Sequence, residues 1–248
     1  MSRPVNDRPY LLLVGGFDPS AGAGILADVK TCEQKGVYGL GVITANTFQT
    51  HNSFESIDWM PKESILQQVK LMLSTYKVAV IKLGLLPDFS ILRDIRSLAA
   101  QFGNPFIVLD PVCKSSSGFG FHKVMDARLL SLVGLITPNW KEVEVLSGSS
   151  DVLEAAKAWS NHTAVLLKGG HSGEKEAVDY LIEKGNVSEL KGARIPGLEK
   201  HGSGCVLASA IAAELAKEEN IIEACRKGKA YTLAFLQSNE GMLGYHKT

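Results

Sequence analysis

The sequence has no excess of either charge, no long apolar run and no paired cysteines. Its 248 residues hold 26 Lys and Arg against 26 Asp and Glu, so there is no basic footprint for nucleic acid or for a membrane surface. No apolar run approaches the length of a membrane-spanning helix, and residues 1–8 lack the apolar core of a signal peptide. The four cysteines are scattered without a CxxC pair, which predicts free thiols in a reducing compartment. We therefore expect a soluble cytoplasmic protein.

The sequence lacks the P-loop and nucleophile-elbow motifs, and its one match to a dinucleotide motif stands in the wrong context. No G-x-x-x-x-G-K-[ST] segment is present, which excludes a P-loop protein. Residues 22–27 formally match the dinucleotide motif G-x-G-x-x-A, but they lie too far beyond the strand expected at 11–14. The strand end at 44–46 also has no acidic residue for a ribose. Ser203 lacks the G-x-S-x-G frame of a nucleophile elbow. The distance of residues 22–27 from the strand and the missing acidic residue lead us to reject a nicotinamide-dependent oxidoreductase.

Short apolar runs alternate with helical segments along nearly the whole chain. Strands are expected at residues 10–14, 41–44, 57–60, 78–82, 106–109, 135–136 and 164–167, with an antiparallel hairpin at 177–182 and 187–193. Helices are expected at 25–35, 61–75, 90–101, 126–132, around 142, and at 152–160, 206–213 and 221–237. This alternation predicts one α/β domain over residues 1–248, with a mostly parallel sheet, helices on both faces and a loose lead-in at 1–9.

Residues that commonly bind ligands are concentrated where the expected parallel strands end. These ends are residues 15–16, 44, 82–84, 110–111, 137–139 and 168–170, which are rich in Gly, Lys, Asp and Asn. In an open parallel sheet the carboxyl ends share one edge, and ligands bind outside that edge. We therefore expect the functional site there.

Residues 200–205 form a glycine-containing turn that leads directly into a helix. The first N–H groups of a helix have no internal partner and carry the positive end of its dipole. Glycines at 202 and 204 allow the backbone to approach a ligand closely. The turn therefore predicts an anion site, with phosphate as the commonest occupant. Cys205 stands at the helix entrance, where we expect a thiolate to be favoured.

Cys205 also leaves a different chemistry open. With His171 or His201 it could serve a thiol hydrolase. That function requires an oriented Cys–His pair, which a sequence does not show, and it leaves the phosphate-like strand ends unexplained.

Seven segments, in order along the chain, carry a resemblance to one enzyme family. They are residues 16–28 (GFDPSAGAGILAD), 42–50 (VITANTFQT), 82–86 (KLGLL), 110–112 (DPV), 137–142 (TPNWKE), 168–171 (KGGH) and 201–205 (HGSGC). Together they resemble the hydroxymethylpyrimidine/phosphomethylpyrimidine kinases of thiamin biosynthesis, which belong to the ribokinase superfamily.

The resemblance implies a three-layer ribokinase-like fold and ATP-dependent phosphorylation. The implied substrate is 4-amino-5-hydroxymethyl-2-methylpyrimidine, followed by its monophosphate, with ATP and Mg²⁺ as cofactors. A pyridoxal or pyridoxine kinase with the same cysteine-type site is the alternative. We expect a homodimer that acts on this small molecule, and neither nucleic acid nor a membrane as a partner.

The resemblance also implies roles for individual residues. The pyrimidine pocket would be lined by Gly16, Asp28, Gln49 and Val112. The anion hole would be formed by Gly202, Ser203 and Gly204, with Cys205 nearest the substrate hydroxymethyl group. The nucleotide would be bound by Lys168, Asn139 and Asp110, and Mg²⁺ would be held through water by Asn139 and Glu142. Backbone donors aimed at the moving phosphoryl group suit a reaction that depends on positioning and charge neutralisation.

The sequence departs from the family pattern at several positions, one of which is Thr50 in place of an asparagine. Ala21 replaces a glycine, which is conservative if the backbone there has a negative φ. Ser203 replaces a threonine and keeps its hydroxyl. Lys114 stands two positions before the lysine usual in the family, so the role of that lysine does not carry over.

Overall fold

The computed structural model describes residues 7–113, 120, 124–169, 178–193, 197 and 199–247. Its centre is a nine-stranded sheet with the order β3-β2-β1-β4-β5-β6-β7-β8-β9. The strands are β1 (Tyr10–Phe17), β2 (Tyr38–Gln49), β3 (Phe54–Trp59), β4 (Val78–Leu83), β5 (Phe106–Leu109), β6 (Leu135–Ile136), β7 (Ala164–Leu167), β8 (Asp179–Glu183) and β9 (Asn186–Leu190). The six strands β1, β2 and β4–β7 run parallel, and β3, β8 and β9 add antiparallel edges.

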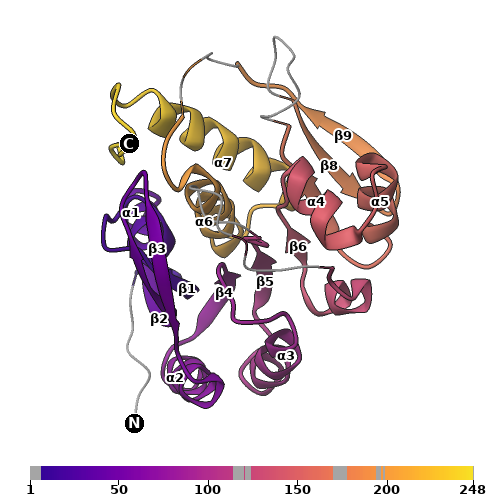
Figure 1. Ribbon diagram of the computed structural model, residues 1–248. Helices are drawn as coiled ribbons and strands as arrows, with labels where there is room; N and C mark the ends of the chain where they lie inside the picture. The colour runs from indigo at the N-terminus through magenta and orange to yellow at the C-terminus, as the bar shows by residue number, and fades with distance from the viewer. Residues whose placement is uncertain are drawn as a thin grey trace.

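Helices cover both faces of this sheet (Figure 1). They are α1 (Gly24–Gln34), α2 (Lys62–Thr75), α3 (Ile91–Gln101), the 3₁₀ helix η1 (Ala127–Leu132), α4 (Trp140–Ser147), α5 (Val152–Trp159), α6 (Ser203–Ala216) and α7 (Ile221–Leu236). One apolar core joins the sheet to α2, α3, η1, α4 and α5, and a second joins it to α1, α6 and α7. Parallel strands covered on both faces must be apolar throughout, as residues 11–14 are. The predicted α/β architecture is confirmed.

The structure extends two of the strands that the sequence predicted. β1 continues through Phe17, because its last residues pair with Ala45 and Asn46 of β2 after a register shift. The predicted loop therefore begins three residues later than position 15. β2 runs to Gln49 and forms an antiparallel hairpin with β3, which begins at Phe54 rather than at residue 57. Both extensions carry residues into the site described below.

Some residues discussed in the sequence analysis lie outside the described structure, and one predicted backbone conformation differs from the observed one. Lys114, His171 and most of the lead-in are among the residues that are not described. Ala21 has a φ of +57°, so the condition of a negative φ, under which its substitution would be conservative, is not met. The four cysteines are free, as predicted. Within the described chain, no helix combines the length and apolar character needed to cross a membrane.

Candidate active site

A cavity of about 520 Å³ lies at the carboxyl edge of the sheet, where the strand order reverses between β1 and β4. Ligands of open α/β sheets bind at such a reversal. The cavity lining includes every residue that the sequence assigned to the site: Gly16, Asp28, Gln49, Asp110, Val112, Asn139, Glu142, Lys168, Gly202, Ser203, Gly204 and Cys205. The structure thus brings these residues together, and their individual roles stay predictions.

Gly202 ends the turn before α6 in a conformation that only glycine adopts readily. Its φ is +75°, and a Cβ there would lie 2.1 Å from the backbone oxygen of Gly22. The N–H of Ser203 donates to the Lys200 carbonyl, and that of Val206 donates to the Gly202 carbonyl. No described carbonyl accepts the N–H groups of Gly204 and Cys205, which therefore remain available to an anion at the positive end of α6.

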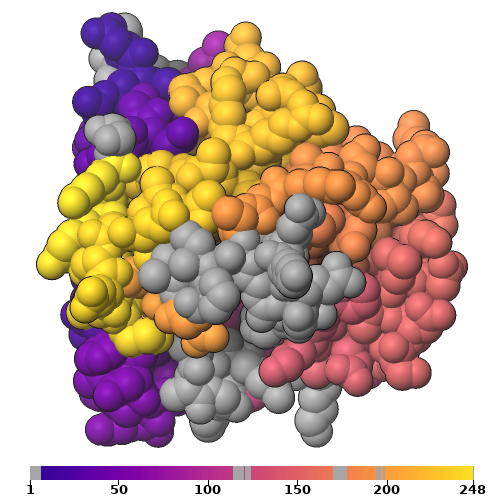
Figure 2. Space-filling view, turned by 90° about the horizontal axis from the view of Figure 1, so that it is seen from above, coloured from indigo at the N-terminus to yellow at the C-terminus, as the bar shows by residue number. Residues whose placement is uncertain are grey.

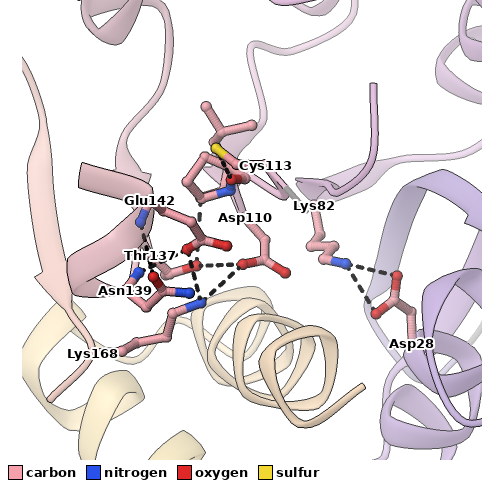
Figure 3. Close-up of polar contacts among 10 residues, drawn as sticks. Asp28, Lys82, Asp110, Cys113, Thr137, Asn139, Glu142 and Lys168 are labelled. Carbon is pink, nitrogen blue, oxygen red and sulfur yellow. Dashed lines mark hydrogen bonds and ion pairs between the residues drawn. The ribbon is translucent and has the colours of Figure 1, made fainter. Parts of the chain in front are cut away.

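Lys168 lies between the carboxylate of Asp110, which directly follows β5, and that of Glu142, in the first turn of α4 (Figure 3). Its Nζ is 3.2 Å from Asp110 Oδ1 and 3.7 Å from Glu142 Oε2. A Cβ added to Gly204 would be 3.6 Å from the same Nζ and 4.0 Å from Asp110 Oδ2, so the charges adjoin the turn. The Thr137 hydroxyl also contacts Asp110, at 3.4 Å. One ammonium thus contacts two carboxylates directly beside the predicted anion hole.

A capping box at the start of α4 fixes Asn139 and Glu142. The Asn139 side chain accepts from the Glu142 N–H at 2.9 Å, and the Glu142 carboxylate accepts from the Asn139 N–H at 2.7 Å. Such reciprocal bonds satisfy two donors that a helix leaves unpaired. Asn139 Oδ1 is therefore committed to the helix, while Glu142 Oε2 also faces Lys168.

Burial and neighbouring charge shift the protonation of this cluster. Burial raises the pKa of Glu142, and the Asp110 carboxylate raises it further, although Lys168 acts in the opposite direction. Burial alone would lower the pKa of Lys168, but the Asp110 and Glu142 carboxylates raise it above its ordinary value. The lysine therefore stays charged, and the environment of Glu142 favours protonation of its carboxyl group more than water does.

Asp28 forms a fully buried ion pair that the sequence did not predict. Lys82 Nζ donates to both carboxylate oxygens at 2.8 and 3.0 Å, and Ser209 Oγ donates to Oδ1 at 2.6 Å. Figure 3 shows Lys82 directed toward Asp28 and away from the Asp110 cluster. Burial alone would lower the pKa of Lys82, but the Asp28 carboxylate raises it. This pair ties α1, β4 and α6 together beneath the cavity.

The surroundings of Cys205 disfavour its thiolate. Burial raises the pKa of its thiol to about 12; Lys82 lowers this pKa, while the Asp28 and Asp110 carboxylates raise it. The helix dipole is worth about 1 kcal/mol at most sites, which is less than the burial of a thiolate costs. Burial and these two carboxylates therefore oppose the thiolate that the sequence predicted. A thiol hydrolase, which requires an activated sulfur, is not supported either.

Asp18 and His201 form a second contact that sequence reasoning missed. Asp18 Oδ2 lies 2.8 Å from His201 Nε2 and also accepts from the Ala23 N–H and the Ser20 hydroxyl, each at 2.8 Å. Burial alone would raise the pKa of Asp18, but hydrogen bonds from His201 and Ser20 hold it below the ordinary value. The pair joins the loop after β1 to the turn before α6. Asp18 lies in the motif at residues 16–28 and His201 in the motif at residues 201–205, and this was the only sequence signal for their contact.

A second cavity, of about 540 Å³, lies on the other side of the turn. Much of its wall is apolar and comes from Leu190, Leu207, Leu233 and Leu236. An ion pair between Lys229 Nζ and Asp179 Oδ2, 2.7 Å long, also lines it, and Asp179 accepts from the Gly169 N–H. The two cavities share four lining residues, which are Asn139, Lys168, Ser203 and Gly204. An apolar wall with a few polar groups is typical of a cofactor site.

The same architecture occurs in a kinase of known structure. The ADP complex of Bacillus subtilis pyridoxal kinase aligns with a TM-score of 0.79 and 28% sequence identity, over 92% of this chain and 92% of that one. The protein therefore has the ribokinase-like fold of small-molecule kinases, as the sequence predicted.

Sequence comparison is more specific than the fold. The model of the phosphomethylpyrimidine kinase family matches residues 18–247. The chain belongs to this family. It is 31% identical over 241 residues to a hydroxymethylpyrimidine/phosphomethylpyrimidine kinase of Aquifex aeolicus, covering 92% of this chain and 94% of the relative. It is 36% identical over 241 residues to a chloroplastic thiamine biosynthetic bifunctional enzyme of Arabidopsis thaliana. That match covers 92% of this chain but only 46% of the plant enzyme, so the chain spans about half of its length.

Proposed function

We propose that this chain transfers the γ-phosphoryl group of ATP to 4-amino-5-hydroxymethyl-2-methylpyrimidine and then to the resulting monophosphate, as one kinase domain of thiamin biosynthesis. The family match and the name of the Aquifex relative support the substrate class. The observation that carries the proposal is the meeting of two cavities at Ser203 and Gly204. A nucleotide in the more apolar cavity and an alcohol in the other would meet at the turn.

The residues around the turn suit phosphoryl transfer, which needs positioning and charge stabilisation rather than covalent help. The N–H groups of Gly204 and Cys205 would donate to oxygens of the moving phosphoryl group, each such donor being worth about 10²–10³ in rate. Lys168 would neutralise negative charge on the nucleotide. Its pairing with Asp110 holds the ammonium beside Gly204 before any ligand binds.

The carboxylates of Asp110 and Glu142 suit Mg²⁺ only in part. Mg²⁺ in phosphoryl-transfer sites takes one or two carboxylates and keeps several waters and substrate oxygens. No group of three or more His, Cys, Asp or Glu side chains in the described chain could hold a metal alone. The donor set therefore fits an ion that arrives with the nucleotide and contacts Glu142 or Asp110 through water. Asn139 would act through the helix cap, because its Oδ1 is already bonded. Bound there, Mg²⁺ would offset charge on the phosphates.

Cys205 would serve as a neutral neighbour of the acceptor hydroxyl. A thiol with a pKa of about 12 is protonated at neutral pH, so its sulfur is not available to accept a proton. A loose, dissociative transition state needs little help from a base. The thiol would then help to position the hydroxymethyl group and exclude water.

Gln49 favours the pyrimidine over the pyridoxal alternative. Its side chain reaches the cavity from the end of β2. An aminopyrimidine presents an acceptor nitrogen beside an amino donor, which matches the donor and acceptor of an amide. Pyridoxal offers a phenolic oxygen and an aldehyde, so it satisfies the amide only in part. The likeness to a pyridoxal kinase keeps that activity as the second candidate.

We also propose a homodimer and a reducing, cytoplasmic location. β3 is an edge strand that pairs with β2 alone among the described strands. Phe48 of β2 is 45% exposed and Trp59 of β3 is 37% exposed, which provides apolar surface for a second copy. Sedimentation velocity would reveal a species of one chain mass if the dimer proposal is wrong.

The four free cysteines suit the proposed reducing, cytoplasmic location.

The direct test is a coupled ADP-release assay with the pyrimidine alcohol, its monophosphate and pyridoxal as separate acceptors. We expect turnover of both pyrimidines, with a kcat/KM for the alcohol above that for pyridoxal. A clear preference for pyridoxal would replace the proposal with the second candidate. ADP release that is equal with and without any acceptor would remove both.

A further inference from the structure

Lys200, the residue before His201 in the turn, is not among the residues assigned to the phosphoryl-transfer site. Only 5% of its surface is exposed to solvent, yet it lines the cavity of about 520 Å³ proposed for the pyrimidine, which we call the acceptor cavity. Its ammonium donates to the main-chain carbonyls of Asn239, at 2.5 Å, and Gly241. Within the described chain no carboxylate lies within 4.0 Å of it. A buried charge without a counter-charge is costly and calls for a reason.

A carboxyl-terminal segment holds this lysine in place. We call residues 238–247 the strap. Besides the two carbonyls, the Met242 carbonyl accepts from the His201 N–H at 2.9 Å. A Cβ on Gly22 would lie 2.6 Å from Leu243, so the strap also packs on the loop after β1. Its His246 lies 3.0 Å from the Tyr231 hydroxyl. In Figure 2 the carboxyl-terminal residues, in yellow, cover one side of the upper face.

Among the described residues that line the acceptor cavity, Lys200 is the buried cation that no carboxylate offsets. Lys82 is paired with Asp28, and Lys168 is paired with Asp110 and Glu142. Carbonyl dipoles satisfy two of the three N–H bonds of Lys200 but do not cancel its charge. The third N–H has no acceptor among the described residues. Lys141 also lines the cavity, but it is exposed on α4 and its charge is solvated.

We propose that Lys200 is a specificity-determining residue that recognises the phosphate of an acceptor already phosphorylated once. The strap carbonyls orient the ammonium, and its remaining N–H would donate to a phosphate oxygen. The alcohol substrate carries no charge and would gain little from this contact. The inference rests on the proposed function, because it assumes that both pyrimidines occupy this cavity.

Lys200→Gln separates charge from orientation, because the amide keeps two N–H donors for the two carbonyls. Isothermal titration calorimetry without nucleotide would measure the affinity of wild type and variant for three probes: the pyrimidine alcohol, its monophosphate and inorganic phosphate. We expect unchanged alcohol affinity and about tenfold weaker monophosphate affinity, the size of one charge-assisted hydrogen bond. The affinity of the variant for inorganic phosphate should fall by a similar factor. Lys141→Gln is the matched control and should change monophosphate affinity by less than about twofold.

Lys200→Arg keeps the charge and the donors, and it should retain the wild-type preference. Thermal melting would reveal whether Lys200→Gln unfolds. If it does, Lys200→Arg still tests the proposal: a folded Lys200→Arg variant that no longer prefers the monophosphate over the alcohol would count against it. Equal monophosphate affinity in wild type and Lys200→Gln would overturn it. A loss caused by Lys141→Gln instead would also overturn it. If the wild-type protein binds neither pyrimidine, the proposed function is contradicted. The affinities of wild type and Lys200→Gln for inorganic phosphate would then still test whether Lys200 binds phosphate.

Discussion

Replacing Lys168 with methionine removes the ammonium that lies between the carboxylates of Asp110 and Glu142. At an effective dielectric constant of about 20, contacts of 3.2 and 3.7 Å correspond to attractions of about 5 and about 4 kcal/mol before desolvation. Loss of one partner from a buried ion pair typically costs about 3–5 kcal/mol, because the remaining charge is uncompensated. We therefore expect Lys168→Met to lose about 3 kcal/mol of unfolding free energy at pH 7.5.

The same variant should respond to pH with a defined sign. The pKa of Glu142 is already raised in the folded protein, and removal of Lys168 should raise it further. A folded state that binds the proton more tightly than the unfolded state gains stability as pH falls. Lys168→Met should therefore recover much of its lost stability between pH 7.5 and pH 5.

Urea unfolding at these two pH values, compared with wild type, would measure both effects. Lys227→Met is a matched control, because Lys227 is exposed and pairs only at the surface of α7. It should change stability little at either pH. The reasoning fails if Lys168→Met is as stable as wild type at pH 7.5, or if acid destabilises it more than it destabilises wild type.

Three further substitutions test the chemistry. Gly204→Val should abolish measurable turnover in the ADP-release assay and leave the far-UV spectrum unchanged, because its side chain would occupy the space in front of Lys168; near-normal kinetics would refute the anion hole. Cys205→Ala should reduce kcat by less than about tenfold, and wild-type Cys205 should react slowly with iodoacetamide at pH 7, because burial raises its pKa to about 12; rapid labelling would contradict this. Gln49→Leu should lower kcat/KM for the pyrimidine alcohol by about tenfold or more, from the loss of one or two buried hydrogen bonds. Its effect on pyridoxal turnover should be small, and equal losses would favour a pyridoxal enzyme.

The main elements of the fold were predictable because a sheet covered on both faces needs continuous apolar strands. Residues 11–14 and 106–109 show this pattern without interruption. The ends of β1 and β2 were not predictable in the same way. Gly15 and Gly16 weaken the strand signal in β1, and the last residues of β2, 47–49, are mixed in polarity and pair with the exposed strand β3 alone among the described strands.

The position of the site followed from topology, since parallel strands end at one edge. The protonation state of Cys205 did not follow, because it depends on burial and on carboxylates from α1 and the end of β5. The Asp18–His201 contact joins residues 183 positions apart. The same limit applies to Lys200, whose partners lie about forty residues further along the chain. Local sequence patterns carry no information on such long-range contacts.

The central claim is that donor and acceptor occupy two cavities that meet at Gly204. A crystal structure of the protein with ADP and the pyrimidine alcohol, both added at saturating concentration, would test it most directly. We expect ADP against Leu207 and Leu233, the pyrimidine beside Gln49, and the hydroxymethyl oxygen facing the β-phosphate across the turn. A nucleotide bound beside Gln49, or a pyrimidine bound elsewhere than in the cavity at the carboxyl edge of β1 and β4, would contradict it.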